Sequence, residues 1–156
     1  MSELVKLDLE SEHTRLNQDS VKSSAPQGFV VSFHVKCSPG EAAKILSDAK
    51  DVLRIINKNS FGNWPSLEGW SALLPNSFVA TFTPDESGSG DDGWTLEDWI
   101  YWFEPNNRVW FWWDAPLLGV DALTVSILVY EHPFAWESLE VLFKQLGAIE
   151  MEEAMG

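Results

Sequence analysis

An aromatic-rich stretch in the middle of the chain sets the strongest limit on the fold. Residues 95–115 read TLEDWIYWFEPNNRVWFWWDA and hold five tryptophans, two phenylalanines and one tyrosine. A buried aromatic side chain removes about 150–250 Å² from water, so each buried ring makes a large contribution to a core. A chain with this stretch must therefore fold around it or present part of it to a partner.

Alternation within the stretch predicts an antiparallel hairpin. Residues 95–103 and 108–114 form two extended runs, and the EPNN segment between them suits a tight turn. Side chains of a strand alternate between two faces, so large rings would lie on both faces of the hairpin. We expect most of the nine tryptophans to lie in the core. About two or three of them should line a concave surface rimmed by carboxylates.

The rest of the chain supplies further strands. Period-two alternation predicts a half-buried strand over residues 29–36 and another within residues 121–133. Residues 5–9 alternate as an edge strand would, and residues 78–82 suit a short strand. A short helical turn is expected near Leu67–Leu73, within an irregular connection.

Two amphipathic helices are predicted. Residues 39–57 carry apolar side chains at helical spacing, and Ser38 and Glu41 are placed as in a capping box. A second helix of about three turns begins at Pro133 and stops at Gly147.

These elements predict an α+β fold, with a mainly antiparallel sheet of about five strands and two helices packed on one face. A chain of 156 residues is normally one domain. We assign the single α+β domain to residues 28–147 and a polar, partly flexible N-terminal segment to residues 1–27. Residues 148–156 form an acidic tail that we expect to fray.

Charge divides the chain into two parts. Residues 1–60 contain eight basic and eight acidic residues, whereas residues 61–156 contain two basic residues and sixteen acids, a net charge of −14. All nine tryptophans lie in the second part. An acidic field together with accessible aromatic rings suits a basic protein partner. It disfavours a nucleic-acid ligand, because the acids would repel phosphates.

Motifs for catalysis or metal binding are scarce. Cys37 is the one cysteine, and none of the three histidines has the spacing of a triad or a zinc site. The segment DESGSGDDGWTLE resembles a calcium loop, but Leu96 stands where a bidentate glutamate is required. Read as strand neighbours, Glu97 and Asp98 point to opposite faces and cannot act as a paired acid and base. We therefore expect no enzymatic activity, no metal and no cofactor.

The N-terminal residues lack the pattern of a signal peptide. No apolar run approaches the roughly 20 residues needed to span a bilayer. We expect a soluble, cytoplasmic protein with no membrane partner.

Three segments carry a family resemblance: NWPSLEGWSALLP, WTLEDWIYWFEPNNRVWFWWDA and HPFAWESLEVLFKQLGA. In these segments, within residues 28–147, the chain resembles small acidic bacterial immunity proteins of polymorphic toxin and contact-dependent growth inhibition systems. The resemblance implies a protein that binds its cognate toxin, often a nuclease, and neutralises it until the toxin is exported. It implies no catalytic residue.

The distribution of charge agrees with such a role. A nuclease has a basic cleft for phosphates, which fixed carboxylates can occupy, and long-range attraction accelerates the encounter. Aromatic anchors then slow dissociation. The candidate toxin-binding residues are six acids and three tryptophans: Asp91, Asp92, Glu97, Asp98, Glu104, Asp114, Trp102, Trp110 and Trp112.

Other functions are compatible with exposed tryptophans. A carbohydrate-binding module would stack indoles on sugar rings, and its binding would respond little to salt. A single-strand nucleic-acid binder would also stack rings, but two basic residues in the second part cannot supply its electrostatic groove. A regulatory or adaptor domain is a further alternative.

Overall fold

The computed structural model describes residues 3–18, 29–82, 94–131 and 134–154. These residues form an α+β fold with a four-stranded antiparallel sheet, in the strand order β2-β3-β1-β4. The strands are β1 (Phe29–Lys36), β2 (Phe111–Asp114), β3 (Ala122–Val129) and β4 (Glu150–Glu153). The predicted fold class is confirmed, with four strands in the described residues rather than about five.

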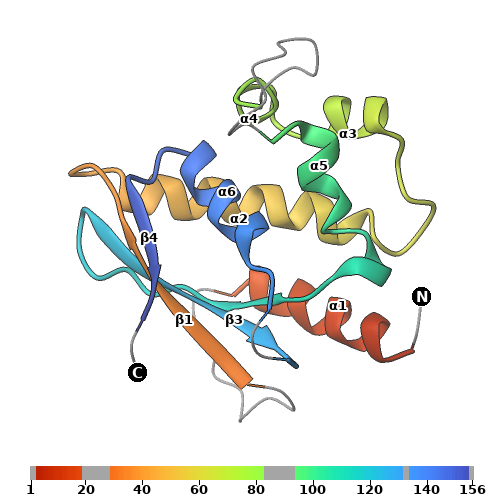
Figure 1. The fold of residues 1–156 in the computed structure, drawn as a ribbon, viewed down its shortest axis with the longest axis horizontal. Helices are drawn as coiled ribbons and strands as arrows, with labels where there is room; N and C mark the ends of the chain where they lie inside the picture. Colours follow the sequence, from red (N-terminus) through yellow and green to blue (C-terminus); the bar gives the residue numbers. More distant parts are fainter. Residues whose placement is uncertain (1–2, 19–28, 83–93, 132–133, 155–156) are drawn as a thin grey trace.

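The described residues contain six α-helices, whereas two were predicted, and α2 and α6 cover one face of the sheet (Figure 1). The helices are α1 (Glu3–Leu16), α2 (Ala42–Lys58), α3 (Leu67–Leu73), α4 (Asn76–Val79), α5 (Leu96–Tyr101) and α6 (Glu137–Gln145). A short 3-10 turn, η2 (Pro105–Asn107), follows α5.

Alternation in β1 and β3 decides which face of the sheet is buried, as predicted. In β1, Phe33 and Val35 are buried, whereas His34 between them is exposed. In β3 the buried side chains of the same face are Leu123, Val125, Ile127 and Val129. On the other face the hydroxyls of Ser32 and Ser126 are 2.8 Å apart. The core therefore lies between the sheet and the layer of α2 and α6.

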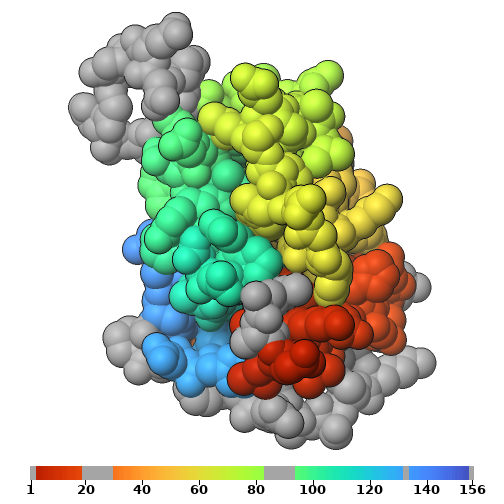
Figure 2. All heavy atoms as spheres, turned by 90° about the vertical axis from the view of Figure 1, so that its right-hand side faces the viewer, coloured from red at the N-terminus to blue at the C-terminus, as the bar shows by residue number. Residues whose placement is uncertain are grey.

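The N-terminal segment forms α1, so the predicted edge strand over residues 5–9 is wrong. The buried side of this helix consists of Leu9, Glu12, Arg15 and Leu16. These positions follow helical spacing, but two of the four side chains are charged. A pattern read from apolar residues alone cannot detect such a helix. Helix α1 packs along β2 and α2, and Figure 2 shows its red atoms beside the yellow and orange atoms of the segment that contains α2.

A buried carboxylate holds α1 against the rest of the fold. Glu12 is 1% exposed, and its Oε2 accepts hydrogen bonds from Arg108 Nη2 at 2.5 Å and from the Trp112 backbone N–H at 2.8 Å. Its Oε1 accepts one from Asn57 Nδ2 at 3.0 Å. The side chain of Arg108 is itself 2% exposed. One side chain of α1 thus joins α2, β2 and the segment that leads into β2.

Further polar contacts extend this attachment. Arg15 Nε donates to the Trp112 carbonyl at 2.7 Å, and its guanidinium lies 4.8 Å from the centre of the Trp113 ring. Burial lowers the pKa of Arg15. The Tyr130 hydroxyl donates to Asp8 at 2.7 Å, and burial together with this hydrogen bond raises the pKa of Tyr130 to about 12.

Helix α2 begins at Ala42 rather than at residue 39. Gly40 has a φ of +83°, in the left-handed region that favours glycine. The backbone N–H groups of Gly40 and Ala42 both donate to the Val120 carbonyl, at 3.0 and 3.2 Å. The N-cap is Glu41 without a side-chain cap, so the capping box predicted for Ser38 and Glu41 does not form.

The predictions for residues 78–82 and for the C-terminal tail are also corrected. The predicted strand over residues 78–82 is wrong, because α4 and a turn occupy this segment and bring the rings of Phe78 and Phe82 to 5.2 Å. The tail that was expected to fray contains β4, which pairs with β1 and buries Met151 opposite Val35.

Two helices lie where the sequence predicts them. Helix α3 coincides with the turn expected at Leu67–Leu73. Helix α6 lies within the predicted segment, and Gly147, with a φ of +115°, follows its end as a C-terminal stop.

Replacing Glu12 tests the buried ion pair. We expect Glu12→Gln to lower the free energy of unfolding by about 3–5 kcal/mol, because Arg108 is left as an uncompensated buried charge. The measurement is urea denaturation at neutral pH. Glu10→Gln on the same helix is the matched control, since Glu10 is exposed, and its change should stay within about 0.5 kcal/mol. Equal losses for the two variants would show that the pair does not hold α1.

Candidate functional site

Helix α5 replaces the first strand of the predicted hairpin. Thr95 Oγ1 accepts a hydrogen bond from the Asp98 backbone N–H, and Asp98 Oδ2 accepts one from the Thr95 backbone N–H, both at 3.1 Å. These two bonds form a capping box. The buried side of the segment carries Leu96, Trp99, Ile100 and Phe103. Their helical spacing overrides the period-two interpretation of residues 95–103.

The second run of the predicted hairpin is a strand for only part of its length. Strand β2 pairs with β3, whereas residues 95–103 pair with no strand in the described structure. Trp112 stacks over Phe143 of α6 at 6.5 Å. The indole N–H groups of Trp99 and Trp110 both donate to Ser138, to its carbonyl at 2.9 Å and to its hydroxyl at 3.0 Å.

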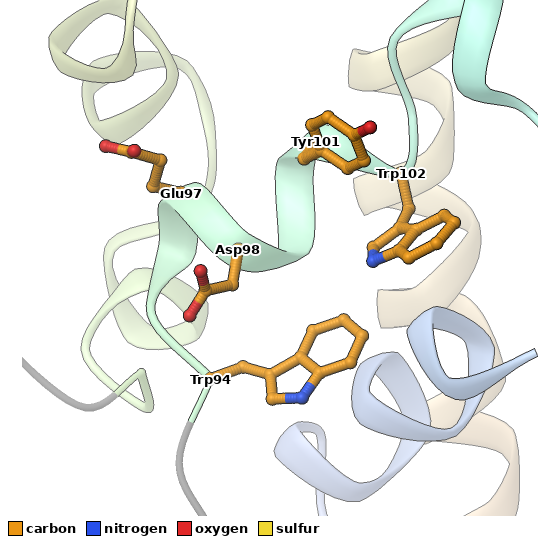
Figure 3. Close-up of a pocket in the computed structure, with 5 residues that line it drawn as sticks. All are labelled: Trp94, Glu97, Asp98, Tyr101 and Trp102. Carbon is orange, nitrogen blue, oxygen red and sulfur yellow. The ribbon is translucent and has the colours of Figure 1, made fainter. Parts of the chain in front are cut away.

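An open pocket of about 330 Å³ lies on the outer side of α5 (Figure 3). Its lining residues are Trp94, Glu97, Asp98, Tyr101 and Trp102. Figure 3 shows Trp94 and Trp102 at the two ends of the helix, with the carboxylate of Asp98 beside Trp94. The pocket therefore combines aromatic surfaces with two acidic side chains.

The aromatic rings of this pocket keep part of their surface accessible. Trp94 and Trp102 are half-buried, and Tyr101 is 54% exposed. The rings of Tyr101 and Trp102 meet edge to face, with centroids 5.4 Å apart. Within the described part of the chain, neither pocket indole donates a hydrogen bond from its Nε1.

The acids of the pocket have no cationic partner within the part of the chain that is described. Among the residues that the structure describes, no lysine or arginine forms an ion pair with Glu97 or Asp98. The two basic residues of the acidic part of the chain are already paired: Arg108 with Glu12, and Lys144 with a glutamate of α6 at 3.4 Å. Within the described ranges, no cation therefore compensates the negative charge of the pocket.

Two other hollows differ from this pocket in their charge. One hollow, of about 410 Å³, is lined partly by Arg108 and Phe111. The guanidinium of Arg108 is already paired with Glu12. The other, of about 240 Å³, brings Lys36 beside Glu150. Neither presents carboxylates without a neighbouring cation.

Three of the predicted toxin-binding residues, Glu97, Asp98 and Trp102, come together in the α5 pocket. Trp110 and Trp112 are only 2% and 1% exposed, so their rings belong to the core. Asp91 and Asp92 lie outside the described residues.

The remaining two predicted acids lie away from the pocket lining. Glu104 is half-buried at the start of η2. Asp114, also half-buried, accepts a hydrogen bond from the backbone N–H of Ala115 at 2.9 Å. The pocket therefore unites a subset of the predicted acids.

Glu97 and Asp98 line the same pocket, so the expectation that they point to opposite faces is wrong. Neighbours on a helix are separated by about 100°, not by the 180° of a strand.

Sequence reasoning missed Trp94 and Tyr101 as members of the site. The signal was present, because the segment TLED has the spacing of a capping box directly before apolar residues. Once a helix starts at Leu96, positions 94, 98, 101 and 102 fall on one side of it.

The described residues contain no group of three or more His, Cys, Asp or Glu side chains that could hold a metal ion. None of the helices described is both long and apolar enough to cross a membrane.

Comparisons of the chain with protein-family models, with curated proteins and with solved structures found no match in any of the three. The pocket must therefore be interpreted from its own residues.

Two tryptophans with different burial test the division between core and site. Trp112→Ala should lower the free energy of unfolding by about 3–5 kcal/mol, because it leaves a large cavity beside Phe143. Trp102→Ala removes a half-buried ring and should lower it by about 1–2 kcal/mol. Urea denaturation of both variants provides the measurement. Similar losses would place Trp102 in the core instead of the site.

Proposed function

We propose that the protein is an immunity protein that binds and neutralises a cognate bacterial toxin with a basic surface, and that the α5 pocket is the centre of its docking face. A nuclease is the partner that fits best, because its cleft is built to attract phosphates. The immunity protein would act in the cytoplasm of the cell that makes the toxin. Immunity itself enters through the family resemblance, and the pocket supports the binding of a cationic protein.

One observation carries the binding proposal: two carboxylates that pair with no described cation share one pocket with two half-buried indoles, on a strongly acidic chain. Aromatic residues at the centre of an interface contribute most of the binding energy once water is excluded. Acids around them steer a basic partner toward the correct face. The pocket has both features within a few residues of each other.

The two features would act at different stages of binding. Long-range attraction between the acidic chain and a basic cleft raises the association rate, most strongly at low salt. Burial of the Trp94 and Trp102 rings against the partner lowers the dissociation rate. A cell that makes a lethal toxin needs fast capture and slow release.

Half-buried indoles next to carboxylates also suit a sugar ring, so a carbohydrate-binding module is the alternative. The two functions differ in their response to salt. Binding of a basic protein weakens as ionic strength rises, because salt screens the attraction. Sugar stacking changes little. Glycan binding that is unchanged in about 0.5 M salt would favour the carbohydrate function. This salt concentration is roughly five times the ionic strength that gives a screening length of about 10 Å.

The direct test uses the gene neighbourhood. We expect the adjacent reading frame to encode a large secreted protein with a basic C-terminal domain. Co-expression of this protein should restore growth to cells that produce that C-terminal domain. Failure to restore growth, or to co-purify with the domain, would contradict the proposal.

Charge reversal locates the docking face. The triple variant Asp91→Lys, Asp92→Lys, Glu97→Lys should associate with the toxin domain about tenfold or more slowly at low salt, because it weakens steering. Asp98 is left unchanged because it caps α5. Stopped-flow fluorescence measures the rate.

The matched control carries the same change of charge on β4, with Glu150→Lys, Glu152→Lys and Glu153→Lys. All three glutamates are exposed. A slower association for the β4 variant, with no change for the first variant, would place the interface at the edge of the sheet.

A further inference from the structure

We propose that the α5 pocket is an arginine receptor: one guanidinium of the partner enters between Trp94 and Trp102 and donates hydrogen bonds to Asp98, while Glu97 adds negative charge at the edge of the pocket. This inference deepens the proposed function and rests on it, since the arginine belongs to the toxin. The contacts, charge and size of the pocket each support it.

The aromatic walls favour a planar cation. A guanidinium stacks on the face of an indole, and tryptophan is the best aromatic partner for such a contact. The protein makes the same contact internally, where Arg15 lies 4.8 Å from the centre of the Trp113 ring and Arg108 lies 4.6 Å from that of Phe111. The rings of Trp94 and Trp102 are partly accessible, and no cation of the described residues lies over either ring.

The carboxylate of Asp98 supplies an acceptor for a guanidinium between the two indoles. Asp98 uses Oδ2 to cap Thr95, and no described residue donates to its Oδ1. Glu97 likewise accepts no hydrogen bond from the described part of the chain. A guanidinium presents five N–H donors in a fixed plane and can bond carboxylates while it stacks. The capping box holds Asp98 in position before the ligand arrives.

The size of the pocket fits a single side chain. Its volume of about 330 Å³ lies at the small end of ligand sites. A lysine ammonium would satisfy the charge but is compact and strongly hydrated, and it cannot stack on an indole as a flat group does. The pocket should therefore prefer arginine to lysine at equal charge.

A peptide series tests this preference without the toxin. The probes are acetyl-Gly-Arg-Gly-amide and the same peptide with lysine or with citrulline, which keeps the planar shape but has no charge. Indole N–H signals of the full chain are followed by NMR during titration, and Trp94→Phe and Trp102→Phe assign the two pocket signals.

The arginine peptide should shift the Trp94 and Trp102 signals and leave those of Trp99 and Trp112 unchanged. The lysine peptide should bind about tenfold more weakly. The citrulline peptide should cause no shift. Glu97→Gln should weaken binding of the arginine peptide, whereas Glu152→Gln, an exposed acid of β4, should not. Unchanged Trp99 and Trp112 signals verify that each variant is folded.

Several results would overturn the inference. Equal shifts with the arginine and citrulline peptides would show that binding does not depend on the charge of the side chain. Equal affinity for the arginine and lysine peptides would show that the pocket does not prefer a planar cation. Shifts caused by glucose but not by the arginine peptide would make the pocket a sugar site.

The toxin domain separates the two proposals. If growth protection and toxin affinity are unchanged by Glu97→Gln and Trp102→Ala, the arginine receptor is wrong and the immunity function stands. If the arginine peptide binds as expected but no toxin is neutralised, the immunity function is wrong and the chemistry of the pocket stands.

Discussion

The buried ion pair of Glu12 and Arg108 is the contact on which the arrangement of the molecule depends. Removing two charges from water is costly, and the pair is tolerated because further hydrogen bonds satisfy the carboxylate. Those bonds come from α2 and from β2. A single side chain thus specifies how three elements meet, which apolar packing alone would define less sharply.

The same ion pair is connected to the rear of the α5 pocket through a series of rings. The Arg108 guanidinium lies 5.6 Å from the Phe103 ring, and the rings of Phe103 and Trp99 are 4.5 Å apart. Trp99 is anchored on Ser138 of α6. Helix α5 is short, so it is held by this packing and its capping box rather than by its own length. The accessible rings of the pocket are therefore carried by a helix that is held in place by the core.

The sequence predicted those parts of the fold in which burial follows apolar periodicity, and it failed where polar groups decide the structure. The inner faces of β1 and β3 are read directly from alternation at positions such as Phe33 and Ile127. Helix α1 was missed because Glu12 and Arg15 occupy its buried side. The apolar residues of 95–103 fit both the period of a strand and that of a helix. The capping box of Thr95 and Asp98 favours the helix. Glu97, Asp98 and Trp102 were found from charge and composition, whereas Trp94 required the helix to be known.

Strand β4 forms one outer boundary of the sheet, and its sequence, EMEE, turns only Met151 inward. Free sheet edges invite pairing with another copy, which leads to aggregation. Here three glutamates line that boundary, and two such edges would repel each other on approach. The exposed glutamates of β4 therefore disfavour edge-to-edge pairing of two copies of the chain.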